Sequence, residues 1–379
     1  MWGRLSDDWI GIKDIIIYGY GRVAQRNIKK LKADFNIQFI IDNAPDWQLI
    51  QNKSNMEIKS LKEAMPFIKL YKIIVATSSL AYESIKNDLL NIGLREYEDF
   101  CRLENFMPEW YWKNKKHVCI SQVLSAVTTK CTFRCRHCSN LMPYFKEQYE
   151  YRANDIIADL SLLFNRVDYL ASYYLIGGEP LLNKNLPEII SQVCENFGHL
   201  IGYIQIITNG SVVPDEKLIS VMNQYDIKVR ISDYTRMIPY KSKFKEVVKA
   251  FMRGGVEYSI SDYKTWMDLG FPQESLNIIN DLHEHMLKCS QGCHSVNDKK
   301  FYYCSTLWDA EKSGLHILNE GDYIDLRKTT GNLERDKIEI LKYCLGSDRN
   351  SYISLCAKCR GFGADNLHLT DVAEQMSSN

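Results

Sequence analysis

The strongest constraint on the fold is a regular alternation of strand-like and helix-like segments through most of the 379 residues. One series occupies roughly the first hundred residues, and a second begins near residue 121. Strands that are separated by helices pair in parallel, with right-handed crossovers between them. The sequence therefore predicts an α/β protein that is built on two parallel-sheet units.

The first series is short and opens with very apolar strands. Its three strand-like runs lie at residues 13–18, 37–41 and 72–77. A helix is expected over residues 80–91, with Gly93 just beyond its end as a cap. These features predict a small Rossmann-like domain over residues 1–105, and we expect residues 106–118 to be a linker.

The second series is longer and is assigned to residues 119–287. Its strands are expected near residues 121–128, 172–176, 203–208, 227–232 and 256–260. Its helices are expected at residues 154–166, 186–197, 215–224, 243–253 and 274–287. Five or six such units suit a full or partial barrel, or an open parallel sheet. Residues 288–368 form a looser cysteine-rich extension, and we expect residues 369–379 to be a frayed tail.

Charge and cysteine content narrow the class of protein. Lys plus Arg and Asp plus Glu both number 47, so the basic excess of a nucleic-acid binder is missing. No apolar stretch approaches the roughly 20 residues of a membrane span, and no signal-peptide pattern opens the chain. We therefore expect a cytoplasmic protein without nucleic-acid or membrane partners. In a reducing cytosol, its twelve cysteines favour metal ligation over disulfides.

Three cysteines follow the first strand of the second series. Cys131, Cys135 and Cys138 have the spacing C-x3-C-x2-C, which lets one loop bind one metal centre. Soft thiolates favour an iron–sulfur cluster, and three cysteines for four irons leave one iron open, as a catalytic site requires. The alternative is a zinc knuckle completed by His137. Because His137 and Cys138 are adjacent, they would find it hard to face one zinc ion together.

The cysteine motif resembles that of the radical S-adenosylmethionine (SAM) superfamily, with His137 at a position that is usually aromatic. The resemblance covers roughly residues 120–360 and implies a central partial (β/α)6 radical SAM barrel. It implies a [4Fe–4S] cluster whose open iron binds the amino and carboxylate groups of SAM. One electron then cleaves SAM to a 5′-deoxyadenosyl radical, which abstracts hydrogen from a substrate.

The next strand ends in GGEP, which resembles the family motif that meets the SAM amino group. Paired glycines let the backbone approach a ligand, and a carboxylate can accept hydrogen bonds from an ammonium group. The ends of the third and fourth strands resemble further SAM contacts, although turn chemistry alone could explain both stretches. The candidate SAM-binding residues are Gly177, Gly178, Glu179, Pro180, Asn209 and Ser232.

Six further cysteines lie between residues 289 and 359. Their spacing resembles the auxiliary-cluster extensions called SPASM and Twitch domains, although Lys299 stands where a glycine normally sits. The chain stops after one C-x2-C pair, so one auxiliary iron–sulfur cluster is implied. The expected ligands are Cys289, Cys304, Cys356 and Cys359. Cys293 could replace Cys289, Cys344 is the spare, and a structural zinc on the same thiolates is the alternative.

A glycine-rich turn links the first strand of the chain to its first helix. Gly19, Gly21 and Ala24 form G-x-G-x-x-A, and Asp42 ends the next strand at about the distance of a ribose-binding acid. This resembles a dinucleotide-binding fingerprint, which implies a nucleotide or NAD. It also resembles the small domain that opens sugar acyltransferases, where a nucleotide-linked sugar can bind. The third interpretation is a docking module in which the glycines only make the turn.

Together, these resemblances imply a radical SAM enzyme that acts on a sugar, an amino sugar or a nucleotide-linked sugar. Dehydrogenation is favoured, because single-auxiliary-cluster relatives include aminocyclitol alcohol dehydrogenases in which that cluster can take the second electron. We expect a reducing partner such as flavodoxin or ferredoxin. Modification of a ribosomally made peptide is the second interpretation. The third, from another class, is a non-catalytic zinc-binding module.

Overall fold

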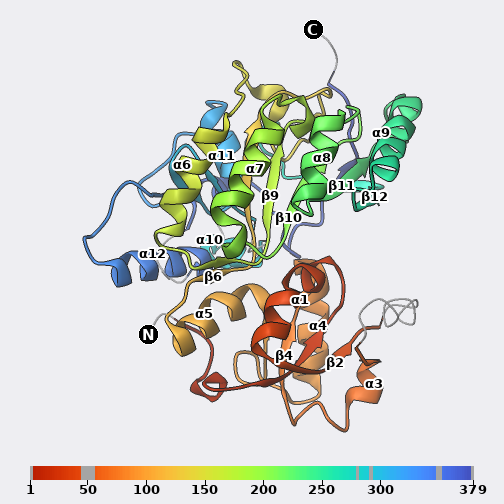
Figure 1. Ribbon diagram of the computed structural model, residues 1–379. Coiled ribbons are helices and arrows are strands. Elements are labelled where there is room, and N and C mark those ends of the chain that lie inside the picture. Colours follow the sequence, from red (N-terminus) through yellow and green to blue (C-terminus); the bar gives the residue numbers. More distant parts are fainter. Residues whose placement is uncertain (1–2, 44–55, 279–280, 290–292, 347–351, 377–379) are drawn as a thin grey trace.

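The chain forms two α/β units, each with a parallel sheet, which are stacked end to end (Figure 1). The computed structural model describes residues 3–43, 56–278, 281–289, 293–346 and 352–376. The amino-terminal unit and the larger unit have separate apolar cores. Each core is formed mainly by one of the two series of strands and helices. Within these ranges, no helix has the length and apolarity to cross a bilayer.

The amino-terminal sheet has five parallel strands in the order β3-β2-β1-β4-β5. They are β1 (Asp14–Tyr18), β2 (Asn36–Ile41), β3 (Ile58–Lys59), β4 (Lys72–Val75) and β5 (Phe100–Arg102). The helices of this unit are α1 (Arg22–Asp34), α3 (Leu61–Ala64) and α4 (Ser79–Asn91). The isoleucines of β1 are fully buried because helices cover both faces of the sheet. The three predicted strands and the helix before Gly93 are confirmed, and β3 and β5 are too short to stand out in the sequence.

A buried helix, α5 (Leu103–Lys115), occupies most of the segment that we expected to be a linker, residues 106–118. Its aromatic side chains make it part of the amino-terminal core. The rings of Trp110 and Phe35 meet edge to face, with their centroids 4.5 Å apart. Pro108 lies inside the helix, and a proline there argues against a helix when the sequence is taken alone. Burial of the aromatic side chains outweighs that local penalty.

The larger sheet has eight strands in the order β12-β11-β10-β9-β7-β14-β15-β16. They are β7 (Val123–Thr128), β9 (Tyr173–Gly177), β10 (Ile204–Thr208), β11 (Lys228–Asp233), β12 (Tyr258–Asp262), β14 (His294–Asn297), β15 (Lys300–Tyr302) and β16 (Tyr323–Asp325). The first five confirm the predicted strands. β14 adds a parallel strand beside β7, and β15 and β16 continue the sheet antiparallel. Two short pairs lie apart, β6 (Cys119–Ile120) with β8 (Tyr169–Leu170), and β13 (Thr265–Met267) with β17 (Leu369–Asp371).

Helices cover one face of the larger sheet, as Figure 1 shows for α6, α7 and α8. The four that match the prediction are α6 (Ala153–Phe164), α7 (Leu186–Phe197), α8 (Glu216–Gln224) and α9 (Lys241–Gly254). α10 (Leu282–Lys288) is shorter than the predicted 274–287, because Asp281 caps it by accepting a hydrogen bond from the backbone N–H of Glu284. Residues 279–280 of that prediction lie outside the described residues. The extension adds α11 (Ser305–Lys312) and α12 (Leu333–Leu345).

The turn between β14 and β15 explains why the extension has a lysine at the position of the expected glycine. Asp298 and Lys299 both have positive φ, 56° and 63°, which is the left-handed conformation that glycine favours. The carboxylate of Asp159 on α6 accepts a hydrogen bond of 2.7 Å from the backbone N–H of Lys299. A side chain from a neighbouring helix therefore supports the turn that glycine would otherwise favour.

Residues 369–376 are held against the rest of the protein, although we expected residues 369–379 to fray, and residues 377–379 of that prediction lie outside the described residues. β17 pairs antiparallel with β13, and the chain then continues along the cysteine loop to Met376. Arg136 N donates to Glu374 O at 2.7 Å, and Met376 N donates to Arg134 O at 2.8 Å. These backbone hydrogen bonds add a strand-like segment to the outer side of the loop.

Candidate functional site

A cavity of about 530 Å³ lies at the carboxyl ends of the parallel strands of the larger sheet. Residues from β7, β9, β10 and β11 line it together with residues of the cysteine-rich extension. Ligands of parallel sheets bind at this edge, because the loops that follow the strands gather there. The volume is that of a site for one or two small molecules.

The three cysteines of the motif follow β7 and gather beside this cavity. Burial, with a smaller contribution from the charge of Cys138, raises the pKa of Cys131 to about 12. Burial also raises the pKa of Cys135 to about 11, with an added contribution from Cys131. The thiols therefore lie close enough for the charge of one to raise the pKa of another, as the ligands of one metal centre must.

Polar groups point at the sulfur atoms of this loop. Gln375 Nε2 donates to Cys135 Sγ at 3.2 Å, and Asn209 Nδ2 lies 3.7 Å from Cys131 Sγ. Hydrogen bonds of this kind stabilise thiolates and tune the potential of iron–sulfur clusters. The donor set therefore fits a cluster that carries negative charge on its sulfur atoms.

The spacing of the thiols also bears on the kind of metal. Among the residues that the structure describes, no three Cys, His, Asp or Glu side chains are gathered closely enough to hold one metal ion. A four-iron cluster places each thiolate on a different iron, so its ligands stand further apart than those of a single ion. A four-iron cluster would therefore place Cys131, Cys135 and Cys138 on three different irons.

The two glycines of GGEP are required by the close packing of β9 on the cysteine loop. A Cβ on Gly177, whose φ is +155°, would lie 2.1 Å from Thr128 O. A Cβ on Gly178 would lie 2.2 Å from Lys130 O and 2.9 Å from the Cβ of Cys131. Both glycines line the cavity, so any larger residue would displace the loop that carries the metal ligands.

The carboxylate of Glu179 is turned away from the cavity, although we expected it to meet the SAM amino group. It is 0% exposed and accepts hydrogen bonds from Thr208 Oγ1 at 2.7 Å and Asn209 N at 2.7 Å. Burial raises its pKa to about 7. Glu179 therefore ties the ends of β9 and β10 together, and Pro180 starts a short 3-10 helix, η3 (Pro180–Leu182).

The ends of β10 and β11 contribute the other predicted SAM contacts. Asn209 and Ser232 both line the cavity. Asn209 Nδ2 donates to Thr132 Oγ1 at 3.0 Å, and its backbone oxygen accepts from Tyr240 Oη at 2.9 Å. The structure thus brings Asn209 and Ser232 to the same cavity as the two glycines and the cysteine loop.

His137 also lines the cavity, but its ring nitrogens face carboxylates. Nδ1 lies 3.1 Å from Asp268 Oδ1, and Nε2 lies 3.7 Å from Glu374 Oε2. Arg360 reaches the second oxygen of Asp268 at 3.1 Å. A zinc knuckle that includes His137 would require the imidazole to leave these partners.

The expected ligands of the auxiliary centre line the same cavity. They are Cys289, Cys304, Cys356 and Cys359. Burial raises the pKa of Cys356 well above its ordinary value, and the charges of the other three raise it further. Backbone N–H groups of Gly361 and Phe362 donate to Cys359 Sγ and Cys289 Sγ, both at 3.3 Å. The four thiols therefore form one group with the hydrogen bonding that thiolates favour.

The remaining two cysteines of the extension have different surroundings. Cys344 on α12 is 6% exposed and packs in the main apolar core. Cys293 lines the cavity, and its Sγ lies 3.7 Å from Gln122 Nε2. Cys344 therefore lies apart from the cavity, whereas Cys289 and Cys293 both line it, and the choice between these two as a ligand stays a prediction.

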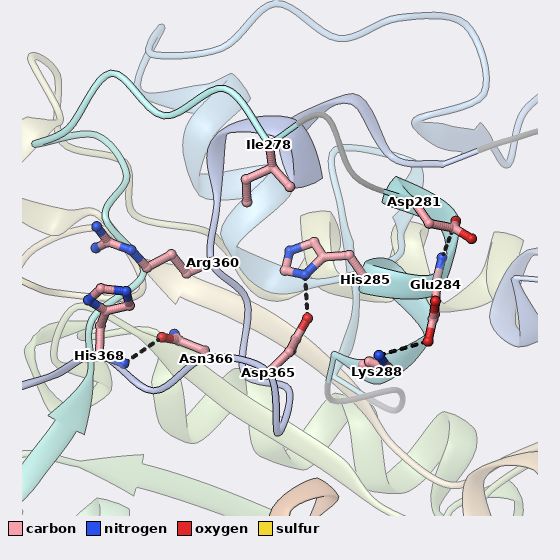
Figure 2. A pocket seen from close by; sticks show the side chains of 9 residues that line it. All are labelled: Ile278, Asp281, Glu284, His285, Lys288, Arg360, Asp365, Asn366 and His368. Atoms are coloured by element: carbon pink, nitrogen blue, oxygen red, sulfur yellow. Dashed lines mark hydrogen bonds and ion pairs between the residues drawn. The ribbon is translucent and has the colours of Figure 1, made fainter.

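A second, smaller pocket of about 310 Å³ lies behind the auxiliary cysteines (Figure 2). His285 separates this pocket from the large cavity, since it lines both. Figure 2 shows Asp365 directed at the ring of His285, with Nδ1 and Oδ2 2.8 Å apart. The other ring nitrogen lies 2.9 Å from the backbone oxygen of Cys359. His285 and Asp365 therefore fix the backbone that carries one of the expected ligands.

Some residues of the site were missed in the sequence. Gln375 lies far along the chain from Cys135, and no local pattern marks it. Tyr234 directly follows β11 and lines the cavity, so its place after a strand end was a usable signal. Asp309 on α11 is 1% exposed, and neither carboxylate oxygen has a hydrogen-bond partner in the described part of the chain. Its charge raises the pKa of Cys138, which places it beside the cysteine loop.

The glycine turn of the amino-terminal unit has the geometry of a strand-to-helix connection. Gly19 has φ +88°, and a Cβ there would lie 2.3 Å from Thr77 Cγ2. Gly21 caps α1, and Asp42 Oδ2 accepts a hydrogen bond of 2.8 Å from the backbone N–H of Tyr20. Asp42 therefore supports the turn itself, and a role in binding ribose stays a prediction.

The family comparison agrees with the cysteine loop and the strand ends. Residues 125–293 match the model of the Radical SAM superfamily. This range contains the three cysteines of the loop, GGEP and the ends of β10 and β11. The chain therefore contains a radical SAM domain over these residues.

The other matches either cover a smaller part of this chain or have a lower sequence identity. The uncharacterized protein MJ0907 of Methanocaldococcus jannaschii is 30% identical over 120 residues, which are 30% of this chain and 38% of that protein. A structure of BtrN with AdoMet and 2-DOIA matches at 17% identity and a TM-score of 0.38, over 68% of this chain and 96% of that one. A structure of anSMEcpe with AdoMet and the Cp18Cys peptide matches at 14% identity and a TM-score of 0.39, over 67% and 92%. TM-scores of this size do not identify a substrate.

Proposed function

We propose that this protein is a radical SAM enzyme that abstracts hydrogen from a small molecule and dehydrogenates it. The substrate class is a sugar, an amino sugar or a nucleotide-linked sugar. The observation that carries the proposal is that cysteines of both groups line one cavity. A single catalytic centre needs only the first group, so the second indicates a redox partner for the same substrate.

The first group fits a [4Fe–4S] cluster held by Cys131, Cys135 and Cys138. When bound, this cluster supplies one electron that cleaves SAM to methionine and a 5′-deoxyadenosyl radical, which takes a hydrogen atom from the substrate. Gly177 and Gly178 would let the backbone approach SAM, and Asn209 and Ser232, which line the same cavity, would contact it from the next strands. An external one-electron donor such as flavodoxin or ferredoxin is required.

The second group fits one auxiliary iron–sulfur cluster of the Twitch or SPASM kind. One thiolate each from Cys289, Cys304, Cys356 and Cys359 would leave none of its four irons open, so electron transfer would remain as its role. Loss of a hydrogen atom leaves a substrate radical, and loss of one proton and one further electron completes the oxidation. An auxiliary cluster held by these four cysteines would accept that second electron.

The size of the cavity supports a small substrate over a peptide. About 530 Å³ must hold the clusters, SAM and the reacting part of the substrate together. The amino-terminal unit contains an α/β sheet with a glycine turn, which suits a nucleotide or nucleotide-linked sugar better than an extended peptide. Peptide modification therefore ranks second, and the non-catalytic zinc-binding module ranks below it.

SAM cleavage by the anaerobically reconstituted, reduced protein tests this proposal. We expect 5′-deoxyadenosine to form, and we expect the Cys131→Ala variant to form none because it loses a ligand of the first cluster. Cys194→Ala is the matched control, since Cys194 stands on α7 apart from both groups. Stoichiometric zinc, little iron and no 5′-deoxyadenosine in the unmodified protein would contradict the proposal.

A further inference from the structure

Three arginines gather where α1 of the amino-terminal unit meets the larger sheet. Arg22 and Arg26 come from α1, and Arg230 comes from β11. Arg22 Nη1 donates to Ser261 Oγ on β12 at 2.8 Å. Cζ of Arg26 lies 4.9 Å from the centroid of the Tyr174 ring on β9. Figure 1 shows α1 on the side of its unit that faces the larger sheet.

Little carboxylate charge balances these arginines, because Glu104, whose pKa the charge of Arg26 affects, forms its ion pair with Arg102. Burial lowers the pKa of Arg26, and the positive charges of Arg230 and Arg22 lower it further. In the described ranges, no Asp or Glu forms an ion pair with any of the three, whereas Arg236 lies 3.7 Å from Asp262. Like charges that are gathered without a counter-ion repel one another, so a bound anion would stabilise this junction.

Arg230 connects this group to the cavity of the candidate site. It lines the cavity beside Ile176 and Ile207, and its buried Nε has no hydrogen-bond partner. Ser232, two residues further along β11, lines the same cavity. Alternate residues of a strand share one face and lie about 6.6 Å apart. An anion at Arg230 would therefore lie about the width of a sugar ring from the strand ends.

We propose that Arg22, Arg26 and Arg230 bind a phosphate group of the substrate, so that the substrate is a phosphorylated or nucleotide-linked sugar. This inference rests on the proposed function, because the sugar ring then lies between the phosphate and the reacting end of the cavity. Guanidinium groups suit phosphate, since each offers a planar fork of N–H donors to two oxygen atoms. The amino-terminal unit would thus contribute two of the three phosphate-binding side chains.

Calorimetric titration of the reconstituted full-length protein with pyrophosphate tests this inference. Inorganic phosphate is a second probe, and acetate at equal ionic strength is the reference. We expect Arg230→Gln to weaken pyrophosphate binding by at least about tenfold, because one forked pair of hydrogen bonds is lost. Arg22→Gln is the second variant, since Arg22 is exposed in the first turn of α1 and its loss should not affect folding.

Arg253→Gln is the matched control. It removes one positive charge from the last turn of α9, where Arg253 is exposed. We expect it to bind pyrophosphate like the unmodified protein. An equal loss in Arg253→Gln and Arg230→Gln would contradict a specific site and indicate an effect of net charge.

The two proposals fail separately. Unchanged pyrophosphate affinity in Arg22→Gln and Arg230→Gln, or no binding beyond the acetate reference, would overturn the phosphate site. If SAM is still cleaved, the proposed function survives that result. Pyrophosphate binding without SAM cleavage would support the site and contradict the proposed enzyme. Tighter binding of pyrophosphate than of phosphate supports a nucleotide-linked sugar, and equal binding supports a sugar monophosphate.

Discussion

Individual residues of the cysteine loop and the strand ends could be predicted because the residues that form each motif lie close together in the sequence. Three cysteines within eight residues must come together, and two glycines at the end of a strand permit close packing on that loop. The role of Glu179 could not be predicted in this way. Its partners on β10 are set by which strands are neighbours, and the sequence does not give strand order.

Asp159 is a buried carboxyl group that makes the free energy of unfolding depend on pH. Burial raises its pKa from 3.8 to about 7, and the charge of Asp298 adds to the rise. A carboxyl group with a raised pKa binds its proton more tightly in the folded state. Its contribution therefore favours folding at low pH and is lost as the pH rises from about 4 to about 7.

The Asp159→Asn substitution should remove this pH dependence. Asparagine keeps an oxygen that can accept the hydrogen bond from Lys299 N, but it does not ionise. Between pH 4 and pH 7, the free energy of unfolding of the unmodified protein should fall relative to that of the variant, by up to about 4 kcal/mol. Urea denaturation across this range is the measurement. Parallel pH profiles for the two proteins would show that Asp159 keeps an ordinary pKa.

At the scale of elements, long periodic helices and apolar strands were predictable, and short or aromatic segments were not. The strands β7, β9, β10, β11 and β12 are the clearest cases. α5 was missed because its aromatic residues do not follow one helical face and because Pro108 lies inside the helix. The carboxyl-terminal segment was missed because its stability comes from pairing with β13 and the cysteine loop, which are distant in the sequence.

The carboxyl-terminal segment gives a testable role to Gln375. Its side chain donates to Cys135 Sγ, and its Oε1 accepts from Arg134 N at 2.9 Å. Hydrogen bonds to ligand sulfur atoms stabilise the reduced form of an iron–sulfur cluster, because that form carries more negative charge. Gln375→Ala should therefore lower the reduction potential of the first cluster by tens of millivolts.

A redox titration followed by electron paramagnetic resonance measures this shift. Gln224→Ala is the control, because Gln224 lies at the end of α8 and away from both cysteine groups. An unchanged potential in Gln375→Ala, with an intact cluster signal, would mean that the segment covers the loop without tuning it.

At the scale of the whole molecule, the sequence predicted two α/β units and a cysteine-rich extension, but not how they share one cavity. The extension adds strands to the same sheet that carries the cysteine loop, beginning with β14 beside β7. The amino-terminal unit places α1 against that sheet. Both arrangements depend on contacts between distant segments, so neither has a local signal in the sequence.

The central claim is that the first cysteine group holds a cluster whose open iron binds SAM. Electron paramagnetic resonance of the anaerobically reconstituted, reduced protein, with and without SAM, tests it most directly. The full-length variant in which Cys289, Cys304, Cys356 and Cys359 are alanine isolates the first site, and the unmodified protein controls for misfolding. We expect a reduced four-iron signal in both proteins whose g-values change when SAM is added. No iron–sulfur signal, or a signal that SAM leaves unchanged in both proteins, would contradict the account.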